Sequence, residues 1–289
     1  MRTPENLAEI LDLEAIEVNL FRGVSPNDGF PRIFGGLVIA QALMAAYKTV
    51  PDRTCHSLHA YFIRPGDVNA PVLYEVERAR DGGTFTTRRV AAIQHGEQIL
   101  NLACSFQTPE DGLEHQTEMP DAPDPESLPT ETEFLRSLGD ELRPRILKMF
   151  EHPRPIDLRW VDPQHPMKPV AKPSTKQVWM RARAPIGDDV RHQHCALAYA
   201  SDMAFMESAL RPHALVWATP GLQAASLDHA MWFHHPFDFN DWILFAQDSP
   251  WASQGRGLVR GQMFSRDGKL VASVAQECLM RVRSKDAPA

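Results

Sequence analysis

One stretch of the chain decides the fold: Phe34-Gly-Gly-Leu-Val-Ile-Ala-Gln-Ala-Leu-Met-Ala-Ala46. From residue 37 to residue 47 the sequence is apolar almost all round, and Gln41 is the one clearly polar side chain. A helix that lacks a polar face is buried. At about 11 residues the segment is too short to cross a bilayer, which takes about 20. We therefore predict a helix over residues 37–47 that other elements wrap, and a curved sheet is the expected wrapper.

Segments rich in β-branched and aromatic residues predict the strands of that sheet. They cover residues 56–64, 72–80, 86–94 and 98–107 in the first half, and residues 226–234, 242–248, 256–265 and 269–282 in the second. Tight turns such as His95-Gly96 and Arg266-Asp-Gly-Lys269 separate neighbouring strands. Two more helices are predicted: a short amphipathic one over residues 4–20, from its apolar spacing, and a mostly apolar one near 203–210.

The two halves of the chain repeat one pattern. The helix start at Phe34 is matched by Tyr199-Ala-Ser-Asp-Met, and Phe62-Ile-Arg-Pro65 by Phe233-His-His-Pro236. A period this long is not that of a solenoid, so it indicates one helix-plus-sheet unit that has been duplicated and fused. A short buried helix wrapped by an antiparallel sheet is the arrangement called a hotdog. The predicted fold class is therefore α+β, with two fused hotdog units forming a double hotdog.

The region between the halves has a different composition. Twelve of the 24 prolines lie between Pro109 and Pro173, which favours a connector with local structure only. One helix is predicted within it, over residues 132–150. The expected division is an N-terminal hotdog over residues 1–110, a linker over 111–155 and a C-terminal hotdog over 156–289.

Composition excludes several classes of protein. The formal charge of −7 argues against a general nucleic-acid surface, although a local arginine cluster can still bind an anionic substrate. The four cysteines are scattered without a CxxC pair, so a reducing compartment is the default expectation. The N-terminal residues lack the apolar core of a signal peptide, and no apolar run is long enough to span a membrane. We expect a cytoplasmic protein without membrane or nucleic-acid partners.

Gln276 is the polar residue that stands out in the second half. It interrupts an otherwise apolar face of the strand 269–282, and the aligned position of the first half is Cys104. A lone buried amide must find hydrogen-bond partners or cost about 1–3 kcal/mol. Gln276 is therefore either a structural residue bonded to nearby backbone or part of a site.

Asp202 has two interpretations as well. It is placed at the start of the predicted helix 203–210, where an aspartate can cap free N–H groups. It is also a carboxylate beside an apolar helix, able to orient or deprotonate a water. The first half has Gly35-Gly36 in the equivalent place, and this asymmetry favours a functional role.

Ser226 is better interpreted as a hydrogen-bond partner than as a nucleophile. It opens the strand that contains Asp228 and His229, but residues so close on one strand cannot form a Ser-His-Asp triad, and no GxSxG motif is present. The histidines around residues 192–194 and 229–235 match no standard zinc spacing, so no metal is expected. Glycine-rich segments such as Asp81-Gly-Gly-Thr84 lack the context of nucleotide-binding loops and are interpreted as hairpin turns.

Longer stretches of this sequence resemble one known family, the acyl-CoA thioesterases of type II (TesB-like), which are double-hotdog proteins. The resemblance runs roughly from residue 10 to residue 284. It is strongest in Phe34-Gly-Gly-Leu-Val, His56-Ser-Leu-His-Ala-Tyr-Phe-Ile-Arg-Pro-Gly-Asp67, Arg88-Arg-Val-Ala-Ala-Ile-Gln94, Ser226-Leu-Asp-His-Ala-Met-Trp-Phe-His234, Gly257-Leu-Val-Arg-Gly261 and Leu270-Val-Ala-Ser-Val-Ala-Gln-Glu277. The linker matches poorly.

The resemblance implies an enzyme that hydrolyses acyl-CoA thioesters to a free acid and CoA, without a cofactor. The family's catalytic aspartate, hydroxyl residue and glutamine fall on Asp202, Ser226 and Gln276 of this sequence. These residues are expected to hold and activate one water, which attacks the thioester directly. The resemblance also implies a dimer or tetramer. One alternative is a hotdog protein that binds acyl-CoA or acyl chains without turnover. The other is a hotdog hydratase or dehydratase, which would require a catalytic histidine on the buried helix of the first half.

Overall fold

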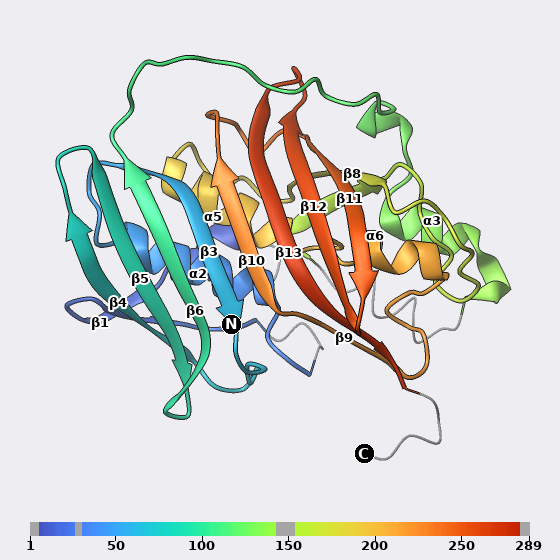
Figure 1. Cartoon of the computed structure of the whole chain (residues 1–289), viewed down its shortest axis with the longest axis horizontal. Coiled ribbons are helices and arrows are strands. Elements are labelled where there is room, and N and C mark those ends of the chain that lie inside the picture. Colours follow the sequence, from blue (N-terminus) through green and yellow to red (C-terminus); the bar gives the residue numbers. More distant parts are fainter. Residues whose placement is uncertain (1–5, 27–30, 143–153, 284–289) are drawn as a thin grey trace.

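A computed structural model describes residues 6–26, 31–142 and 154–283 of the chain. One antiparallel sheet runs through these residues in the strand order β1-β2-β4-β5-β6-β3-β10-β13-β12-β11-β8-β7, and β9 pairs with β13 outside this path. Figure 1 shows the sheet with the central helices behind it.

Each half contributes one set of elements. The first half consists of α1 (Leu7–Leu11), β1 (Glu14–Glu17), β2 (Leu20–Gly23), α2 (Gly35–Tyr47), β3 (Thr54–Phe62), β4 (Val72–Asp81), β5 (Phe85–Gln94) and β6 (Glu97–Gln107). The second half consists of β7 (Ile156–Trp160), β8 (Lys176–Ala182), α5 (Val190–Ser201), α6 (Glu207–Leu210), β9 (Leu222–Ser226), β10 (Asp228–Phe233), β11 (Ile243–Ser253), β12 (Arg256–Ser265) and β13 (Leu270–Val282). The short elements η1 (Pro125–Ser127), α3 (Glu131–Ser137) and η2 (Gly139–Glu141) lie between the halves, and η3 (Arg211–His213) follows α6.

The halves join edge to edge where β3 pairs antiparallel with β10. At the centre of this seam His59 lies opposite Ala230. These two residues are equivalent in the repeat, since each lies six positions before its proline, Pro65 or Pro236. Equivalent residues therefore face each other across a local two-fold axis.

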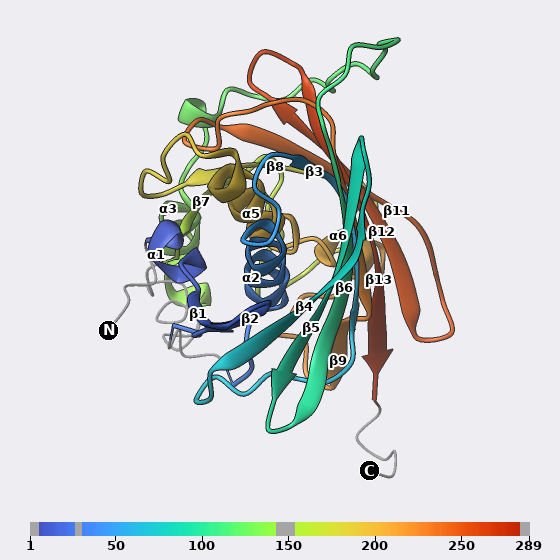
Figure 2. The same cartoon turned by 90° about the vertical axis from the view of Figure 1, so that its left-hand side faces the viewer.

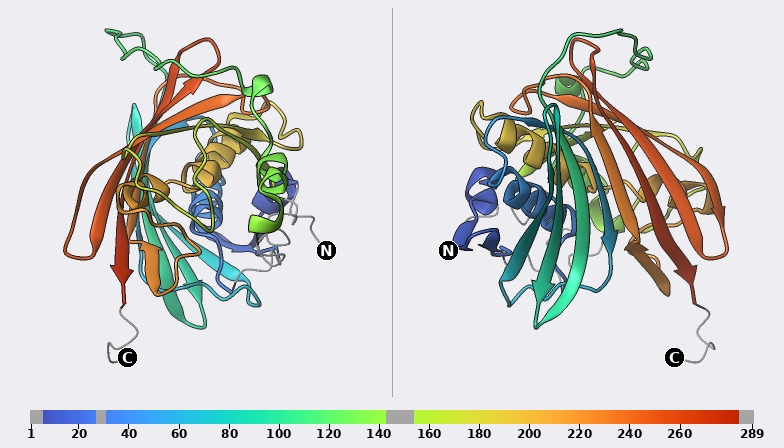
Figure 3. Two further views of the ribbon diagram at one scale, coloured as in Figure 1. Left: turned by 90° about the vertical axis from the view of Figure 1, so that its right-hand side faces the viewer. Right: turned by 60° about the vertical axis from the view of Figure 1, so that its left-hand side comes forward.

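The two central helices pack against each other on the concave face of the sheet (Figures 2 and 3). They are antiparallel. The ring of Phe34, at the start of α2, lies 4.9 Å from that of Tyr199 near the end of α5. At the other end, the Tyr47 hydroxyl lies 2.9 Å from Nδ1 of His194. One cluster of buried apolar residues contains members of both halves, so the molecule has a shared core.

The predicted helix 37–47 is confirmed as α2, and from Gly36 onward every residue of it is buried. Of the predicted helix near 203–210 the structure has only the short α6 (Glu207–Leu210), which is not the second central helix. That role belongs to α5, whose first turns contain polar residues that hide it from a reading based on hydrophobicity. Gln193 and His194 are buried there with hydrogen-bond partners: the Gln193 amide donates to the Gly187 carbonyl, and its oxygen accepts from the Phe239 N–H.

Two other predictions need correction. The segment 4–20 is not one helix, because α1 ends at Leu11 and the edge strand β1 follows from Glu14. Helix α3 covers only Glu131–Ser137 of the predicted 132–150, and residues 143–150 lie outside the described part of the chain. The division at residues 110 and 155 stays a proposal.

The linker packs against side chains of the second half. Its residues Met119, Ala122 and Leu128 pack against a small cluster of buried side chains that includes Trp179 and Trp242. The Trp179 indole donates to the carbonyl of Pro123 at 2.8 Å.

The contact between α2 and α5 generates a prediction about stability. A Cβ on Gly36 would collide with the Tyr199 carbonyl oxygen, which belongs to the backbone and cannot rotate away. We expect Gly36→Ala to lower the free energy of unfolding by about 1–3 kcal/mol in urea denaturation. Gly83→Ala is the matched control, because a Cβ there meets no atom within 4 Å. Equal stability of the two variants would show that the helices do not require this close approach.

Candidate active site

The structure brings Asp202, Ser226 and Gln276 together. The Ser226 hydroxyl donates to Oδ1 of Asp202 at 3.2 Å, and the Gln276 amide nitrogen donates to the Ser226 oxygen at 2.9 Å. The three side chains come from the end of α5, the end of β9 and the middle of β13. Residues 74 positions apart in the sequence thus form one hydrogen-bonded cluster.

Asp202 lies at a helix terminus, but not at the one that the sequence predicts. It is the C-cap residue of α5, where the helix dipole disfavours a negative charge. Its carboxylate instead accepts a hydrogen bond from the backbone N–H of Gly36, in the first turn of α2. Glycine allows this approach, since a Cβ on Gly35 would lie 2.7 Å from Oδ2 of Asp202. The predicted match of the helix start at Phe34 with Tyr199 is therefore wrong, because Gly35 and Gly36 begin α2 whereas Tyr199 and Asp202 lie at the end of α5.

Burial raises the pKa of Asp202 from its ordinary value to about 7. Desolvation disfavours the charged carboxylate, and the hydrogen bonds from Ser226, Gly36 and Gln276 offset only part of this effect. The side chain keeps a partial opening to solvent. A carboxyl group with this pKa exchanges protons readily near neutral pH, which suits a general base.

A break in the strand pairing determines where Ser226 points. The sequence predicts one strand over 226–234, but the structure has two, β9 and β10, separated by Leu227. Ser226 pairs with Cys278, and Ala230 pairs with Ala275. Side chains three positions apart on a regular strand point to opposite faces, whereas this irregularity turns both Ser226 and His229 toward Gln276.

Gln276 is buried, as its strand pattern predicts, with 1% of its surface exposed. Its oxygen lies 2.7 Å from Nδ1 of His229, and Nε2 of that ring lies 2.9 Å from the Ser201 hydroxyl. Sequence reasoning considered His229 only for a triad or a metal and missed Ser201. The signal that marks His229 is its equivalent in the first half, Leu58, since both lie seven residues before the matching proline.

Other interpretations of these residues find no support. Asp228 does not join the cluster through His229, because its Oδ1 accepts from the backbone N–H of Glu277 at 2.6 Å. Among the described residues, no group of three or more His, Cys, Asp or Glu side chains is arranged to hold a metal ion. The glycine-rich segments lie at hairpin turns, with Gly82 and Gly83 between β4 and β5 and Gly255 between β11 and β12.

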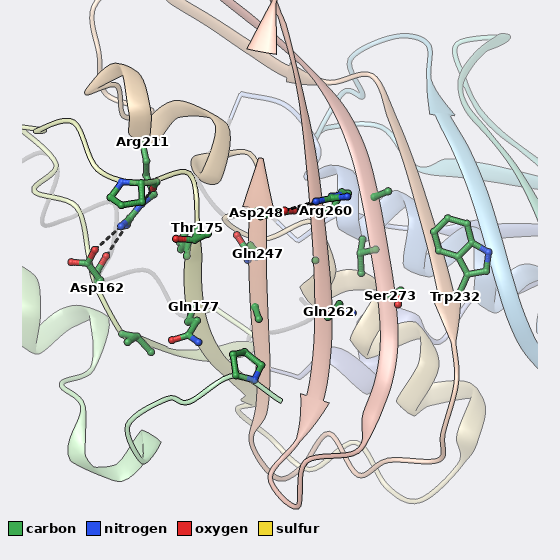
Figure 4. A pocket seen from close by; sticks show the side chains of 18 residues that line it. Asp162, Thr175, Gln177, Arg211, Trp232, Gln247, Asp248, Arg260, Gln262 and Ser273 are labelled. Atoms are coloured by element: carbon green, nitrogen blue, oxygen red, sulfur yellow. Dashed lines mark hydrogen bonds and ion pairs between the residues drawn. The ribbon is translucent and has the colours of Figure 1, made fainter. Parts of the chain in front are cut away.

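A groove of about 840 Å³ lies elsewhere on the second half (Figure 4). Two ion pairs mark it, between Arg211 and Asp162 and between Arg260 and Asp248. None of Asp202, Ser226 and Gln276 lines it. The groove is therefore separate from the candidate site.

Within the described residues, no helix is long and apolar enough to cross a membrane.

Comparisons with known protein families find matches for both halves of the chain. Residues 25–107 match the family model described as acyl-CoA thioesterase N-terminal domain, and residues 148–279 match the model described as acyl-CoA thioesterase. Acyl-CoA thioesterase 2 of Haemophilus influenzae is 41% identical over 277 residues, covering 96% of this chain and 97% of its own. Human acyl-coenzyme A thioesterase 8 is 42% identical, covering 95% of this chain and 88% of its own.

Solved structures have the same fold. The crystal structure of acyl-CoA thioesterase II TesB2 from Mycobacterium marinum matches with a TM-score of 0.78 and 42% identity, over 98% of this chain and 99% of that one. A conserved protein with a hot dog fold from Alicyclobacillus acidocaldarius matches with a TM-score of 0.77 over 96% of this chain and 98% of its own; at 21% identity it speaks for the fold alone. The chain therefore belongs to the TesB-like acyl-CoA thioesterase II family and has the double-hotdog fold.

Proposed function

We propose that this protein hydrolyses acyl-CoA thioesters to a free carboxylic acid and CoA, by direct attack of a water that Asp202, Ser226 and Gln276 hold. The observation that supports this most strongly is the hydrogen-bonded cluster of Asp202, Ser226 and Gln276, in which burial raises the pKa of Asp202 to about 7. Ser226 and Gln276 place polar hydrogens beside the Asp202 carboxyl group, within an otherwise apolar interior.

The proposed reaction needs no covalent enzyme intermediate. Asp202 accepts one proton from the water as its oxygen attacks the thioester carbonyl carbon. The tetrahedral intermediate then collapses, the C–S bond breaks, and the leaving sulfur takes the proton from the Asp202 carboxyl group. The carboxylic acid and free CoA leave, and the carboxylate is restored. Ser226 acts by positioning the water, because its hydroxyl proton is already directed at Asp202.

The start of α2 is the proposed site for the negative charge that develops on the thioester oxygen. The first N–H groups of a helix have no intrahelical acceptor, and the helix dipole adds a partial positive charge there. Gly36 already directs its N–H at Asp202, so the first turn of α2 borders the reacting atoms. Donors of this kind stabilise the transition state more than the substrate.

The alternative function is binding of acyl-CoA or acyl chains without turnover. The intact cluster of Asp202, Ser226 and Gln276 favours hydrolysis, since a binder has no use for a buried carboxylate with a raised pKa. Incubation with a panel of acyl-CoA substrates of graded length, with release of free thiol followed by a thiol reagent, separates the two functions. The family resemblance further supports a dimer or tetramer as a proposal, and the cytoplasmic location stays a proposal from the sequence.

Replacement of Asp202 by asparagine tests the general base. Asn keeps an oxygen that accepts from Ser226 and Gly36 but cannot take a proton, so we expect kcat for thiol release to fall by a factor on the order of 10² or more. An unchanged kcat would refute the assignment.

The free energy of unfolding of the same variant, measured at different pH values, checks that it folds. The folded-state pKa is raised, so ionisation of Asp202 destabilises the fold progressively from about pH 4 to about pH 7. Asp202→Asn should therefore be more stable than the wild type at pH 8, by roughly 4 kcal/mol at most, and similar to it at pH 4.

The dependence of kcat/KM on pH tests the same residue without mutation. The base must be ionised to act, and kcat/KM reports the pKa values of the free enzyme, so kcat/KM should rise with pH up to about 7 and level off above it. Spontaneous hydrolysis measured without enzyme is subtracted at each pH. The residual rate of Asp202→Asn should lack this midpoint, and a midpoint that survives in the variant would assign the titration to another group.

Substitutions of Ser226 distinguish a positioning hydroxyl from a nucleophile. Ser226→Thr retains the hydroxyl and should retain substantial activity, whereas Ser226→Ala loses the link between Gln276 and Asp202 and should lose about 10- to 100-fold in kcat. Rapid quenching followed by mass spectrometry should find no acyl group on Ser226. A trapped acyl-enzyme would replace water attack with covalent catalysis.

A further inference from the structure

Behind the three proposed catalytic residues lies a second, fully buried part of the same hydrogen-bond chain. From Gln276 the chain continues to His229 and then to Ser201, over distances of 2.7 and 2.9 Å. Gln276, His229 and Ser201 are each at most 1% exposed. Ser201 is the last residue of α5 and directly precedes Asp202. The chain thus starts and ends on neighbouring residues and forms a loop through β10 and β13.

The direction of donation along this chain is fixed when Asp202 is ionised. A carboxylate only accepts, so Ser226 donates its single hydroxyl proton to Asp202. Ser226 then accepts from the Gln276 NH₂ group, which leaves the Gln276 oxygen facing His229 as an acceptor.

His229 completes this direction of donation. Its Nδ1 must hold the proton that the Gln276 oxygen accepts. Burial lowers the pKa of His229 to about 4, so the ring is neutral and Nε2 is an acceptor. The Ser201 hydroxyl, whose single proton is within reach of both Nε2 and the Ala198 carbonyl oxygen, is the polar partner of Nε2.

A flipped amide would break this order. If the Gln276 oxygen faced Ser226, it would compete with Asp202 for one hydroxyl proton, and the Gln276 NH₂ group would point away from the site. A donor at the His229 position opposes the flip, because it pairs with the amide oxygen and repels the amide hydrogens.

The repeat supports a link between His229 and Gln276. In the first half, the equivalent residues are Leu58 and Cys104, which lie directly opposite each other on β3 and β6. Cys104 and Gln276 each lie eight residues after the glycine of a hairpin turn, Gly96 or Gly268. Imidazole and amide therefore occur together in the half that contains Asp202, and neither occurs at these positions in the other half.

We propose that His229 is a positioning residue for the hydrolysis: its Nδ1–H holds the Gln276 amide so that the NH₂ group faces Ser226 and the attacking water. The inference rests on the proposed function and deepens it. His229 contacts neither the water nor the substrate and acts through Gln276 alone.

The first experiment compares His229→Leu with His229→Asn by steady-state kinetics. Leu fills the space without a donor, and we expect kcat to fall about 10- to 100-fold while KM changes by less than about twofold. Asn places an amide N–H near the position of Nδ1, so it should restore most of the lost kcat. Equal activity of both variants and wild type would overturn the proposal, as would equal loss in both.

A double-mutant cycle tests whether His229 acts through Gln276. In the Gln276→Ala background, His229→Leu should cause no further loss of kcat, because the group that it positions is gone. Independent, additive losses would overturn the inference. Wild-type activity of Gln276→Ala itself would instead refute the proposed role of Gln276. Impaired Gln276→Ala combined with fully active His229→Leu would refute the role of His229 alone.

His194→Leu is the matched control for removal of a buried histidine. His194 is 4% exposed and neutral, and it bonds Tyr47 and stacks on Phe233 away from Gln276. We expect this variant to lower the melting temperature without lowering kcat. The same loss of kcat as in His229→Leu would assign both effects to general destabilisation.

Ser201→Ala keeps the proposal testable if His229→Leu does not fold. It removes the hydroxyl partner of Nε2, together with its bond to the Ala198 carbonyl, with a minimal change of shape. We expect a loss of kcat of several-fold that disappears in the Gln276→Ala background, and a loss that persists there would overturn the proposed chain.

Discussion

The close approach of the start of α2 to the end of α5 is the constraint on which the rest of the structure depends. Only glycine at positions 35 and 36 lets the two helix ends meet, because a side chain there would strike Asp202 or the Tyr199 carbonyl. The contact places a carboxylate of one half against the N–H groups of the other. The α5 terminus alone would disfavour that charge, whereas the α2 terminus partly compensates for it. The candidate site is thus a property of the fused pair.

Around this contact the protein keeps polar groups in an apolar interior by giving each a partner. The irregularity at Leu227 is central to this, because it directs Ser226 and His229 to the same face of β13. A regular strand would turn one of them away and leave a buried polar atom without a partner, at a cost of about 1–3 kcal/mol. The carboxyl group of Asp202, at the end of this hydrogen-bond chain, remains destabilising when ionised, as is usual for residues retained for activity rather than stability.

The sequence was sufficient for the elements that follow simple periodicity, and for the residues that break it. The apolar segment 37–47 predicts α2, and the lone amide at Gln276 is buried as its strand pattern implies. Helix α5 was missed because its buried Gln193 and His194 appear polar in sequence and become compatible with the core only through partners far along the chain. The terminus that meets Asp202 could not be predicted either, since Gly36 is 166 positions away and only the packing of the halves brings it near. The break at Leu227 is not visible in the hydrophobic periodicity of the sequence.

The seam between β3 and β10 has a consequence for how the protein responds to dilution. His59 lies opposite Ala230 across the local two-fold axis, so each half occupies the place that a second copy would take in a symmetric dimer of single units. In such a dimer, the glycines that correspond to Gly35 and Gly36 would belong to one subunit and the carboxylate that corresponds to Asp202 to the other. The two would separate as the concentration fell. Here the two are covalently tethered, and their encounter is intramolecular with a high effective concentration. One chain therefore keeps the whole cluster assembled at any protein concentration.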